Sequence, residues 1–459
     1  MTAETYETAL VLGLGASGEE AARLLLAEGT RVTVADSGDG APLRRAAAEL
    51  ERAGAAVTLG RPELPAGTYG GCIVSPGISC QSAWVKEIEA RGVRVLSELE
   101  LGWRRRRSRI VAVTGSNGKS TAVKLCADAL GRAGWRAAPG GNFGPPVLKL
   151  VRETAPPDWL VVEVSSFQLE RVDHFRPEVG VLLNIHPNHL DRHGDMETYA
   201  GLKARLFARM QPGDAAIVFE DALGAAARFA SPPGGWTVFG SSERADYRYG
   251  EGHVRWLEKR NPGLDVSREG SISVSKTLFD NQVLGLTAAA VSAAVSACGS
   301  DPEYVAAAAR SFQALPHRMT VAGEIGGVRF VDNSKATNLA ATAASLKMID
   351  GPVMLIAGGL LKETDLVSIS KTFAGKLRGA YLIGKAAKAM SAAWGASTPC
   401  HLCSDLTDAV WRAWRDAERG DTVLLSPGCA SFDQFTGFEE RGKRFVDVVG
   451  AIKEDREKR

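Results

Sequence analysis

The most restrictive feature of the sequence is a glycine-rich segment between a predicted strand and a predicted helix. The apolar run Ile110–Val113 leads directly into Thr114-Gly-Ser-Asn-Gly-Lys-Ser-Thr121, and a helical pattern follows. Glycines let successive backbone N–H groups turn toward phosphate oxygens, and the helix start adds its positive dipole end. Lys119 supplies a mobile cation and Ser120 a hydroxyl for Mg²⁺. We interpret the segment as a shortened P-loop that binds a nucleoside triphosphate, because Thr114 stands where the standard loop has glycine. The alternative is a glycine turn with a chance lysine.

Short apolar runs alternate with amphipathic stretches along the chain, which predicts an α/β fold with parallel sheets. A chain of 459 residues exceeds what one core serves. We expect three domains: a Rossmann-like N-terminal domain (1–108), a central P-loop ATPase domain (109–313) and a Rossmann-like C-terminal domain (314–459). Strands are expected at 9–12, 31–35, 110–113, 159–164, 179–184, 328–331, 353–356, 380–383 and 422–425. The Gly- and Ser-rich region 231–276 is expected to hold short antiparallel strands.

A second glycine loop follows the first predicted strand. It reads Gly13-Leu-Gly15-Ala-Ser-Gly18, and Asp36 ends the next strand, as in a dinucleotide-binding opening. Taken alone, this pattern predicts NAD. Because the later P-loop already implies a nucleoside triphosphate, a nucleotide-linked substrate suits the first loop equally well. A purely structural glycine turn remains the third interpretation.

The composition narrows the class of protein. The net charge is +2 and no run of 18 apolar residues occurs, so we expect neither a nucleic-acid nor a membrane partner. The N-terminus shows no secretory pattern, and seven scattered cysteines fit reduced thiols, so we expect a cytoplasmic protein. Cys400-His-Leu-Cys403 has CxxC spacing, but no second Cys or His pair follows at zinc-finger distance, so we expect neither a metal nor a redox role for it. The run Arg104–Arg107 is interpreted as a solvated linker.

Several motifs together resemble the Mur ligase family. They are Thr114–Thr121, Glu163-Val-Ser-Ser-Phe-Gln-Leu-Glu170, Leu315-Pro-His-Arg318, Asn333-Ser-Lys-Ala-Thr-Asn338 and Ser426-Pro-Gly-Cys-Ala-Ser-Phe-Asp-Gln-Phe435. The resemblance spans nearly the whole chain and is greatest to the members that add glutamate. It implies the three domains above, ATP and Mg²⁺ as cofactors, and UDP-N-acetylmuramoyl-L-alanine and D-glutamate as substrates. A monomer is expected. The sequence departs from the family pattern in the order Asp332-Asn333 and at Asp280-Asn281.

The resemblance also implies roles for individual residues. ATP is expected at Thr114, Gly115, Ser116, Asn117, Gly118, Lys119, Ser120, Thr121, Arg318, Asp332 and Asn333. Metal ligation is expected from Ser120, Glu163, His189 and a carbamylated Lys203, and catalysis from Lys119, Glu163, His189 and Lys203. Substrates are expected at Gly15, Ala16, Asp36, Ser37, Ser75, Gly77, Asn142, Ser165, Lys335, Thr337, Lys362, Ser431, Phe432 and Phe438.

Alternatives stay open at this point. Without the resemblance, Lys203 is a solvated lysine on an amphipathic helix, and Glu163 and His189 are capping residues. Either Glu163 or His189 could deprotonate the incoming amine. The rival functions are a nicotinamide-dependent oxidoreductase, a folylpolyglutamate-synthase-like ligase, a ligase that adds L-glutamate and a non-catalytic nucleotide-binding protein.

Overall fold

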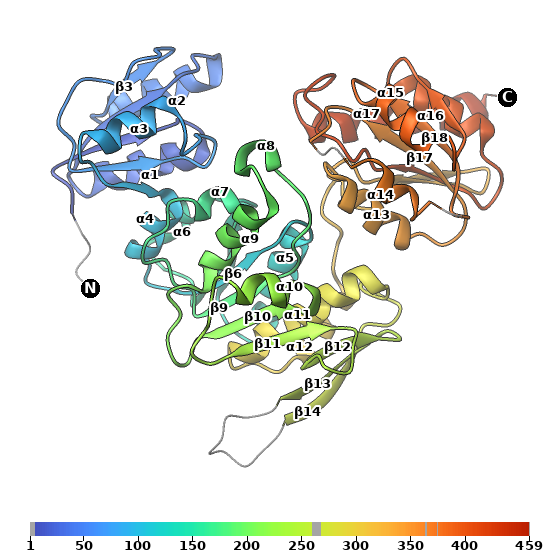
Figure 1. The fold of residues 1–459 in the computed structure, drawn as a ribbon, viewed down its shortest axis with the longest axis horizontal. Helices are drawn as coiled ribbons and strands as arrows, with labels where there is room; N and C mark the ends of the chain where they lie inside the picture. Colours follow the sequence, from blue (N-terminus) through green and yellow to red (C-terminus); the bar gives the residue numbers. More distant parts are fainter. Residues whose placement is uncertain (1–4, 259–267, 363–364, 374, 459) are drawn as a thin grey trace. The chain divides into compact units, whose positions relative to one another are not determined.

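The computed structural model of the chain describes residues 5–258, 268–362, 365–373 and 375–458. Within these residues the strands form three sheets, each built from one continuous stretch of sequence (Figure 1). The chain divides into two compact units. The first comprises Met1–Ile185, Asp195–Ser275 and Gly285–Arg310, and the second comprises His186–Gly194, Lys276–Leu284 and Ser311–Arg459. The predicted α/β fold class is confirmed, whereas the domain boundaries at 108 and 313 stay predictions.

The first sheet is parallel throughout, in the order β3-β2-β1-β4-β5. Its strands are β1 (Thr8–Leu12), β2 (Arg31–Asp36), β3 (Ala56–Leu59), β4 (Gly71–Val74) and β5 (Val95–Ser97). The helices of this stretch are α1 (Ala16–Ala27), α2 (Ala41–Arg52), α3 (Ala83–Ala90) and α4 (Glu98–Arg105). Buried aliphatic side chains form two clusters that draw on alternate residues of β1, so both faces of the sheet are covered.

The interpretation of Arg104–Arg107 as a solvated linker is wrong for Arg104 and Arg105, whereas Arg107 is exposed and lies between α4 and β6. Arg104 and Arg105 end helix α4, and their side chains are only 7% and 8% exposed. Arg104 Nε lies 2.8 Å from Glu100 Oε1, and Arg105 Nε lies 2.7 Å from Glu28 Oε1. A run of like charges looks solvated in sequence because its partners come from other helices or other turns.

The second sheet has nine strands in the order β14-β13-β12-β11-β10-β9-β6-β8-β7. They are β6 (Arg109–Thr114), β7 (Ala137–Gly141), β8 (Trp159–Glu163), β9 (Val179–Leu182), β10 (Ala215–Phe219), β11 (Trp236–Gly240), β12 (Tyr247–Gly250), β13 (His253–Glu258) and β14 (Arg268–Ser273). The helices from 119 to 310 are α5 (Lys119–Arg132), α6 (Val147–Val151), α7 (Ser166–Leu169), α8 (Leu190–His193), α9 (Met196–Ala204), α10 (Glu220–Ala227), α11 (Gln282–Ala297) and α12 (Glu303–Arg310), with a 3₁₀ turn at Arg205–Phe207.

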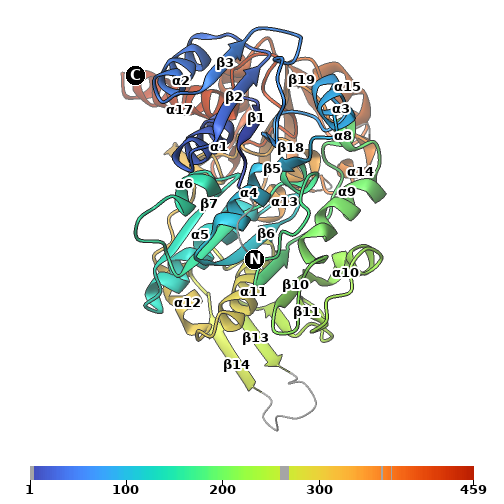
Figure 2. The same ribbon diagram turned by 90° about the vertical axis from the view of Figure 1, so that its left-hand side faces the viewer.

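The region 231–276 is only partly as predicted. Strands β12, β13 and β14 pair antiparallel, and β13 and β14 extend as a hairpin from the sheet (Figure 2). Strand β11 instead pairs parallel with β10 and with β12, so the prediction is wrong there. The part of the prediction that concerns residues 259–267 lies outside the described residues.

The third sheet has the order β15-β16-β20-β17-β18-β19, and only the β15–β16 pair is antiparallel. The strands are β15 (Thr320–Ile325), β16 (Val328–Asp332), β17 (Val353–Gly358), β18 (Leu377–Ile383), β19 (Cys400–Leu402) and β20 (Thr422–Leu425). The helices are α13 (Leu339–Lys347), α14 (Val367–Ser370), α15 (Ala387–Trp394), α16 (Leu406–Asp416) and α17 (Phe438–Glu457). Separate apolar clusters cover its two faces. No helix within the described ranges is long and apolar enough to span a membrane.

Candidate active site

The glycine loop lies where its sequence predicts, between strand β6 and helix α5. Gly115 and Gly118 have φ angles of +155° and +84°, which side-chain-bearing residues rarely adopt. A Cβ on Gly115 would lie 3.0 Å from Leu183 Cβ and 3.3 Å from the backbone nitrogen of Asn184. The loop therefore needs glycine at Gly115 for both its conformation and its close packing.

Asn184, which the sequence analysis missed, fastens this loop. Its carbonyl accepts the Ser116 N–H at 3.1 Å, and its Oδ1 accepts the Asn117 N–H at 2.9 Å. Its Nδ2 donates to the Asn117 carbonyl at 3.1 Å. The only signal in the sequence was its place at the end of a predicted strand that leads into a polar loop. These bonds hold the backbone of the loop in one shape before any phosphate arrives.

Glu163 ends strand β8, next to β6, and its carboxylate faces the start of helix α5. Ser120 Oγ donates to Glu163 Oε2 at 2.5 Å, and Asn142 Nδ2 donates to Oε1 at 2.9 Å. Ser120 and Glu163 are buried. A hydroxyl and a carboxylate beside a phosphate loop are the oxygen ligands that Mg²⁺ takes when it also binds substrate phosphates. These residues therefore fit the predicted metal.

Two lysines converge on the same loop. Lys119 Nζ donates to the carbonyls of Gly115 and Ser116 at 2.9 and 3.1 Å. Lys203 Nζ, from helix α9, donates to the Gly115 carbonyl at 2.9 Å and lies 4.6 Å from the centre of the Tyr199 ring. Both amines donate to the Gly115 carbonyl, and the Lys119 ammonium beside the loop favours an anionic ligand.

Lys203 is buried, with a relative exposure of 1%, so the interpretation of it as a solvated lysine is wrong. Burial lowers the pKa of Lys203 well below its usual value, the nearby Lys119 ammonium lowers it further, and Glu163 opposes both. The helix also brings in Tyr199, another residue missed in the sequence, whose hydroxyl lies 3.1 Å from Ser116 Oγ.

Ser165 begins helix α7 with a capping box. Its hydroxyl accepts the Gln168 backbone N–H, while the Gln168 side-chain oxygen accepts the Ser165 N–H at 2.9 Å. Gln168 Nε2 then donates to Glu98 Oε1 at 2.8 Å. Burial raises the pKa of Glu98, which its hydrogen bonds from Gln168 and the Leu99 N–H oppose. Ser165 is thus held through Gln168 by the helix that follows the first sheet.

The predicted residues of the first sheet gather at the carboxyl ends of β1, β2 and β4. Asp36 accepts the N–H groups of Leu14 and Gly38 at 2.7 and 2.8 Å, and Ser75 Oγ donates to the Gly13 carbonyl at 3.0 Å. A Cβ on Gly18 would lie 1.8 Å from the Gly13 carbonyl oxygen. The remaining predicted members of this group are Gly15, Ser37 and Gly77, which lie in the same three loops, and Ala16, which is the first residue of α1. The glycine loop is therefore closely packed, and Asp36 serves to order it.

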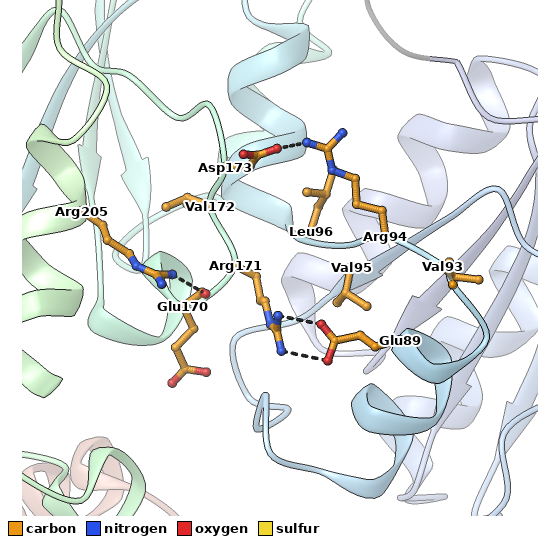
Figure 3. A pocket seen from close by; sticks show the side chains of 11 residues that line it. Glu89, Val93, Arg94, Val95, Leu96, Glu170, Arg171, Val172, Asp173 and Arg205 are labelled. Atoms are coloured by element: carbon orange, nitrogen blue, oxygen red, sulfur yellow. Dashed lines mark hydrogen bonds and ion pairs between the residues drawn. The ribbon is translucent and has the colours of Figure 1, made fainter.

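A cavity of about 530 Å³ lies apart from these loops (Figure 3). It is lined by Glu89, Gly92–Leu96, Glu170–Asp173 and Arg205. Arg171 Nη1 lies 2.7 Å from Glu89 Oε1, and Arg94 forms an ion pair with Asp173. Because these arginines are matched by carboxylates, we interpret the cavity as an ion-paired junction beside β5.

In the second unit, the end of strand β16 gathers several predicted residues. Asp332 Oδ2 lies 2.6 Å from His317 Nδ1, and Asn333 Nδ2 donates to Ser426 Oγ at 3.2 Å. Lys335 Nζ lies 3.7 Å from the centre of the Phe438 ring. His317 was not predicted as a site residue, although it stands beside Arg318 in a quoted motif. In the order found here, the carboxylate of Asp332 faces His317, and the amide of Asn333 faces the strand β20 side.

Other predicted residues are placed by their loops. Ser431 is buried, whereas its neighbour Phe432 is 70% exposed. His189 has a φ of +56° and begins α8 in the segment 186–194, which belongs to the second unit, so the first unit alone does not bring it to Glu163. Arg318 lies in the loop before β15, Thr337 in the loop before α13, and Lys362 after β17. The roles of these residues stay predictions.

Comparisons with known proteins agree with this architecture. Family models described as the Mur ligase middle domain and the Mur ligase glutamate ligase domain match residues 113–262 and 317–429. A protein of Acidobacterium capsulatum named UDP-N-acetylmuramoylalanine–D-glutamate ligase is 36% identical, over 96% of this chain and 95% of its own. One of the same name from Rubrobacter xylanophilus is 38% identical, over 96% and 98%.

Solved structures share the fold at low identity. A pseudomurein peptide ligase type C of Methanothermus fervidus has a TM-score of 0.61 and 16% identity, covering 97% of this chain and 100% of its own. MurF of Acinetobacter baumannii has a TM-score of 0.61 and 15% identity, covering 95% and 93%. FolC of E. coli has a TM-score of 0.50 and 18% identity, covering 83% and 100%. From the identity and coverage of its relatives, the chain belongs to the Mur ligase family.

Proposed function

We propose that this chain is an ATP- and Mg²⁺-dependent ligase that joins D-glutamate to UDP-N-acetylmuramoyl-L-alanine. The observation that carries the proposal is the buried Ser120–Glu163 pair beside a P-loop, joined by Asn142, in a chain whose near-full-length relatives bear that ligase name. The substrate carboxylate takes the γ-phosphoryl group of ATP, and ADP leaves. The amine of glutamate attacks the resulting acyl-phosphate, an amide bond forms, phosphate leaves and the amine loses a proton.

The first unit carries out the phosphoryl step. ATP supplies the phosphoryl group that makes the carboxylate an acyl donor. The N–H groups of residues 115–121 surround its phosphates, and Lys119 neutralises the charge that spreads in the transition state. Ser120 and Glu163 would hold Mg²⁺, and Arg318 of the second unit would contribute a further cation. Asn142 orients Glu163 and, with Ser165, contacts the substrate.

The remaining roles follow the loops in which the residues lie. The uridine diphosphate contacts Gly15, Ala16, Asp36, Ser37, Ser75 and Gly77. Glutamate contacts Lys335, Thr337, Lys362, Ser431, Phe432 and Phe438, where a lysine, hydroxyls and backbone N–H groups suit two carboxylates. Asp332 and Asn333 contact the nucleotide. Glu163 or His189 accepts the proton of the amine.

Lys203 carries a carbamate in the active enzyme. Burial lowers the pKa of Lys203 and so favours the neutral amine, which is the form that attacks CO₂. The C–N bond forms, the displaced C=O electron pair moves to oxygen, and the nitrogen loses a proton to solvent. The product is an anion beside Glu163, able to orient Mg²⁺ where an ammonium would repel it.

The rival functions account for fewer features of the site and of the relatives. A nicotinamide-dependent oxidoreductase has no use for the Lys119–Ser120–Glu163 arrangement, and a non-catalytic nucleotide binder needs no buried lysine beneath the loop. A folylpolyglutamate-synthase-like ligase shares the fold, but FolC covers 83% of this chain whereas the relatives named above cover 96%.

Offering equal D- and L-glutamate with ATP and UDP-N-acetylmuramoyl-L-alanine tests the function directly. We expect phosphate release that requires both glutamate and the nucleotide-linked substrate, and a product containing D-glutamate on a chiral column. The D preference rests on the relatives, because residue types alone suit either enantiomer. An L product would leave the ligase chemistry intact but refute the substrate. Phosphate release with a folate substrate would refute the nucleotide-linked substrate, and incorporation of lysine or diaminopimelate would refute the acidic amino acid.

The two units are expected to close when ligands bind. The P-loop lies in the first unit, and Lys335, Thr337 and Ser431 lie in the second. Amine and acyl-phosphate must come within about 3 Å, and an acyl-phosphate open to water would hydrolyse. Solution X-ray scattering should show a smaller radius of gyration with a non-hydrolysable ATP analogue and UDP-N-acetylmuramoyl-L-alanine together. An unchanged radius would contradict closure.

The setting of the reaction follows from its substrates. We place the enzyme in the cytoplasm, in the synthesis of peptidoglycan precursors, and hence in cell-wall formation, cell shape and cell division. We propose that it acts as a monomer without nucleic-acid or membrane partners. The segment 1–108 binds the UDP substrate, 109–313 binds ATP and 314–459 binds glutamate.

A further inference from the structure

We propose that Arg441 is a positioning residue that holds three loops of the second unit in the arrangement that receives glutamate. The inference rests on the proposed function, since those loops carry Lys335, Ser431 and Phe438. It concerns a residue that touches none of the reacting groups and acts only through its neighbours.

Arg441 lies in the first part of helix α17 and is 1% exposed. Its Nη2 and Nε donate to the carbonyl and Oγ of Ser334 at 2.8 and 3.0 Å, and its Nη1 donates to the Cys429 carbonyl at 3.1 Å. Ser334 Oγ donates in turn to the Phe438 carbonyl at 2.8 Å. One guanidinium thus joins the loop after β16, the loop after β20 and the start of α17.

Burying a charged guanidinium costs free energy of folding. Its presence in the interior therefore argues for a specific role. Among the residues that the structure describes, the acceptors of its three hydrogen bonds are two carbonyls and one hydroxyl, and none is a carboxylate. Burial lowers the pKa of Arg441 to about 10, although Asp433 and Asp332 favour its charged form from a distance. A buried charge is tolerated when its donors are satisfied. The planar guanidinium of an arginine can donate to two separate backbone segments at once and so fixes the distance between them. The ammonium of a lysine, at the end of a flexible side chain, does not.

The three loops present the predicted contacts to glutamate. Lys335 follows Ser334 directly, and its Nζ lies against the Phe438 ring. Ser431 lies two residues beyond Cys429 and is buried. Helix α17 also packs closely on the His317–Asp332 pair, because a Cβ on Gly442 would lie 2.1 Å from His317 Nδ1. A shift of Arg441 would therefore move Lys335, Phe438 and Ser431 relative to one another.

The test compares Arg441→Lys with Arg444→Lys in the full-length protein. Arg444 is an exposed arginine of the same helix, so it is a matched control. For Arg441→Lys we expect the KM for D-glutamate to rise on the order of tenfold or more, since charge-assisted bonds are lost, with the KM for UDP-N-acetylmuramoyl-L-alanine within about twofold of wild type. Ser334→Ala should raise the same KM by less, and the double variant should fall short of the product of the two effects.

A purely structural role predicts a different result. Lower thermal stability with an unchanged KM for D-glutamate, or equal rises in all substrate KM values, would overturn the proposal. A second measurement does not need the ligase reaction. Amide hydrogen exchange of residues 334–336 and 429–432 should be faster in Arg441→Lys than in Arg444→Lys, and equal exchange would also overturn it. If the wild type does not use D-glutamate, the proposed function fails, and the exchange result still decides whether Arg441 fixes these loops.

Discussion

Replacing Lys119 with alanine is expected to lower kcat on the order of a thousandfold or more. The reason is that Lys119 provides the P-loop's side-chain cation, and phosphoryl transfer depends on neutralising the charge that develops on the moving group. In the structure its Nζ donates to the Gly115 and Ser116 carbonyls of the loop. Steady-state phosphate release with both substrates at saturation measures the effect.

The matched control is Lys124→Ala, on the same helix. Lys124 Nζ pairs with Asp128 at 2.6 Å, and its side chain is 29% exposed, so only a small change in rate is expected. A Lys119→Ala enzyme with near-normal turnover would show that the P-loop interpretation is wrong. Equal losses in both variants would instead point to damage to helix α5.

The sequence predicted the P-loop because its determinants are local. Strand, glycines and helix start lie within about a dozen consecutive residues, and the backbone physics of each applies wherever the segment is found. The same holds for the ends of β1 and β2, where the glycine loop and Asp36 lie as expected. Parallel strands bring such ends to one edge, so their proximity follows from the fold class.

What the sequence could not provide is burial and pairing across distant segments. Lys203 reads as solvated because its neighbours alternate in polarity, yet helix α9 turns it beneath the P-loop. The arginines after Leu101 read as a charge run, yet Glu100 and Glu28 pair with them. Asn184 and Arg441 are bound almost wholly through contacts that are far away in sequence. Such contacts depend on which elements pack together, and no local pattern encodes that.

Lys203→Ala is expected to lose on the order of a hundredfold in kcat, the scale typical of removing a group that orients a metal ligand. In the carbamate proposal, the side chain is an anion, so small anions that enter the vacated space should replace it. Formate or acetate should therefore restore part of the activity in a concentration-dependent way. The control is Lys149→Ala, which removes an exposed lysine. Its kcat should match that of the wild type and should not change when formate or acetate is added.

The charge of Lys203 decides between its two possible uses. An unmodified ammonium would support the loop by donating to the Gly115 carbonyl. In that case Lys203→Arg would retain activity, and added methylamine would restore activity to Lys203→Ala. A carbamate predicts the opposite: the arginine variant stays inactive because guanidinium does not take up CO₂, and only carboxylic acids help. Wild-type activity should also fall when bicarbonate and CO₂ are removed and return when they are added. Full activity of Lys203→Ala would show that neither use is needed, whereas rescue by amines would overturn the carbamate and leave Lys203 as a cationic support of the loop.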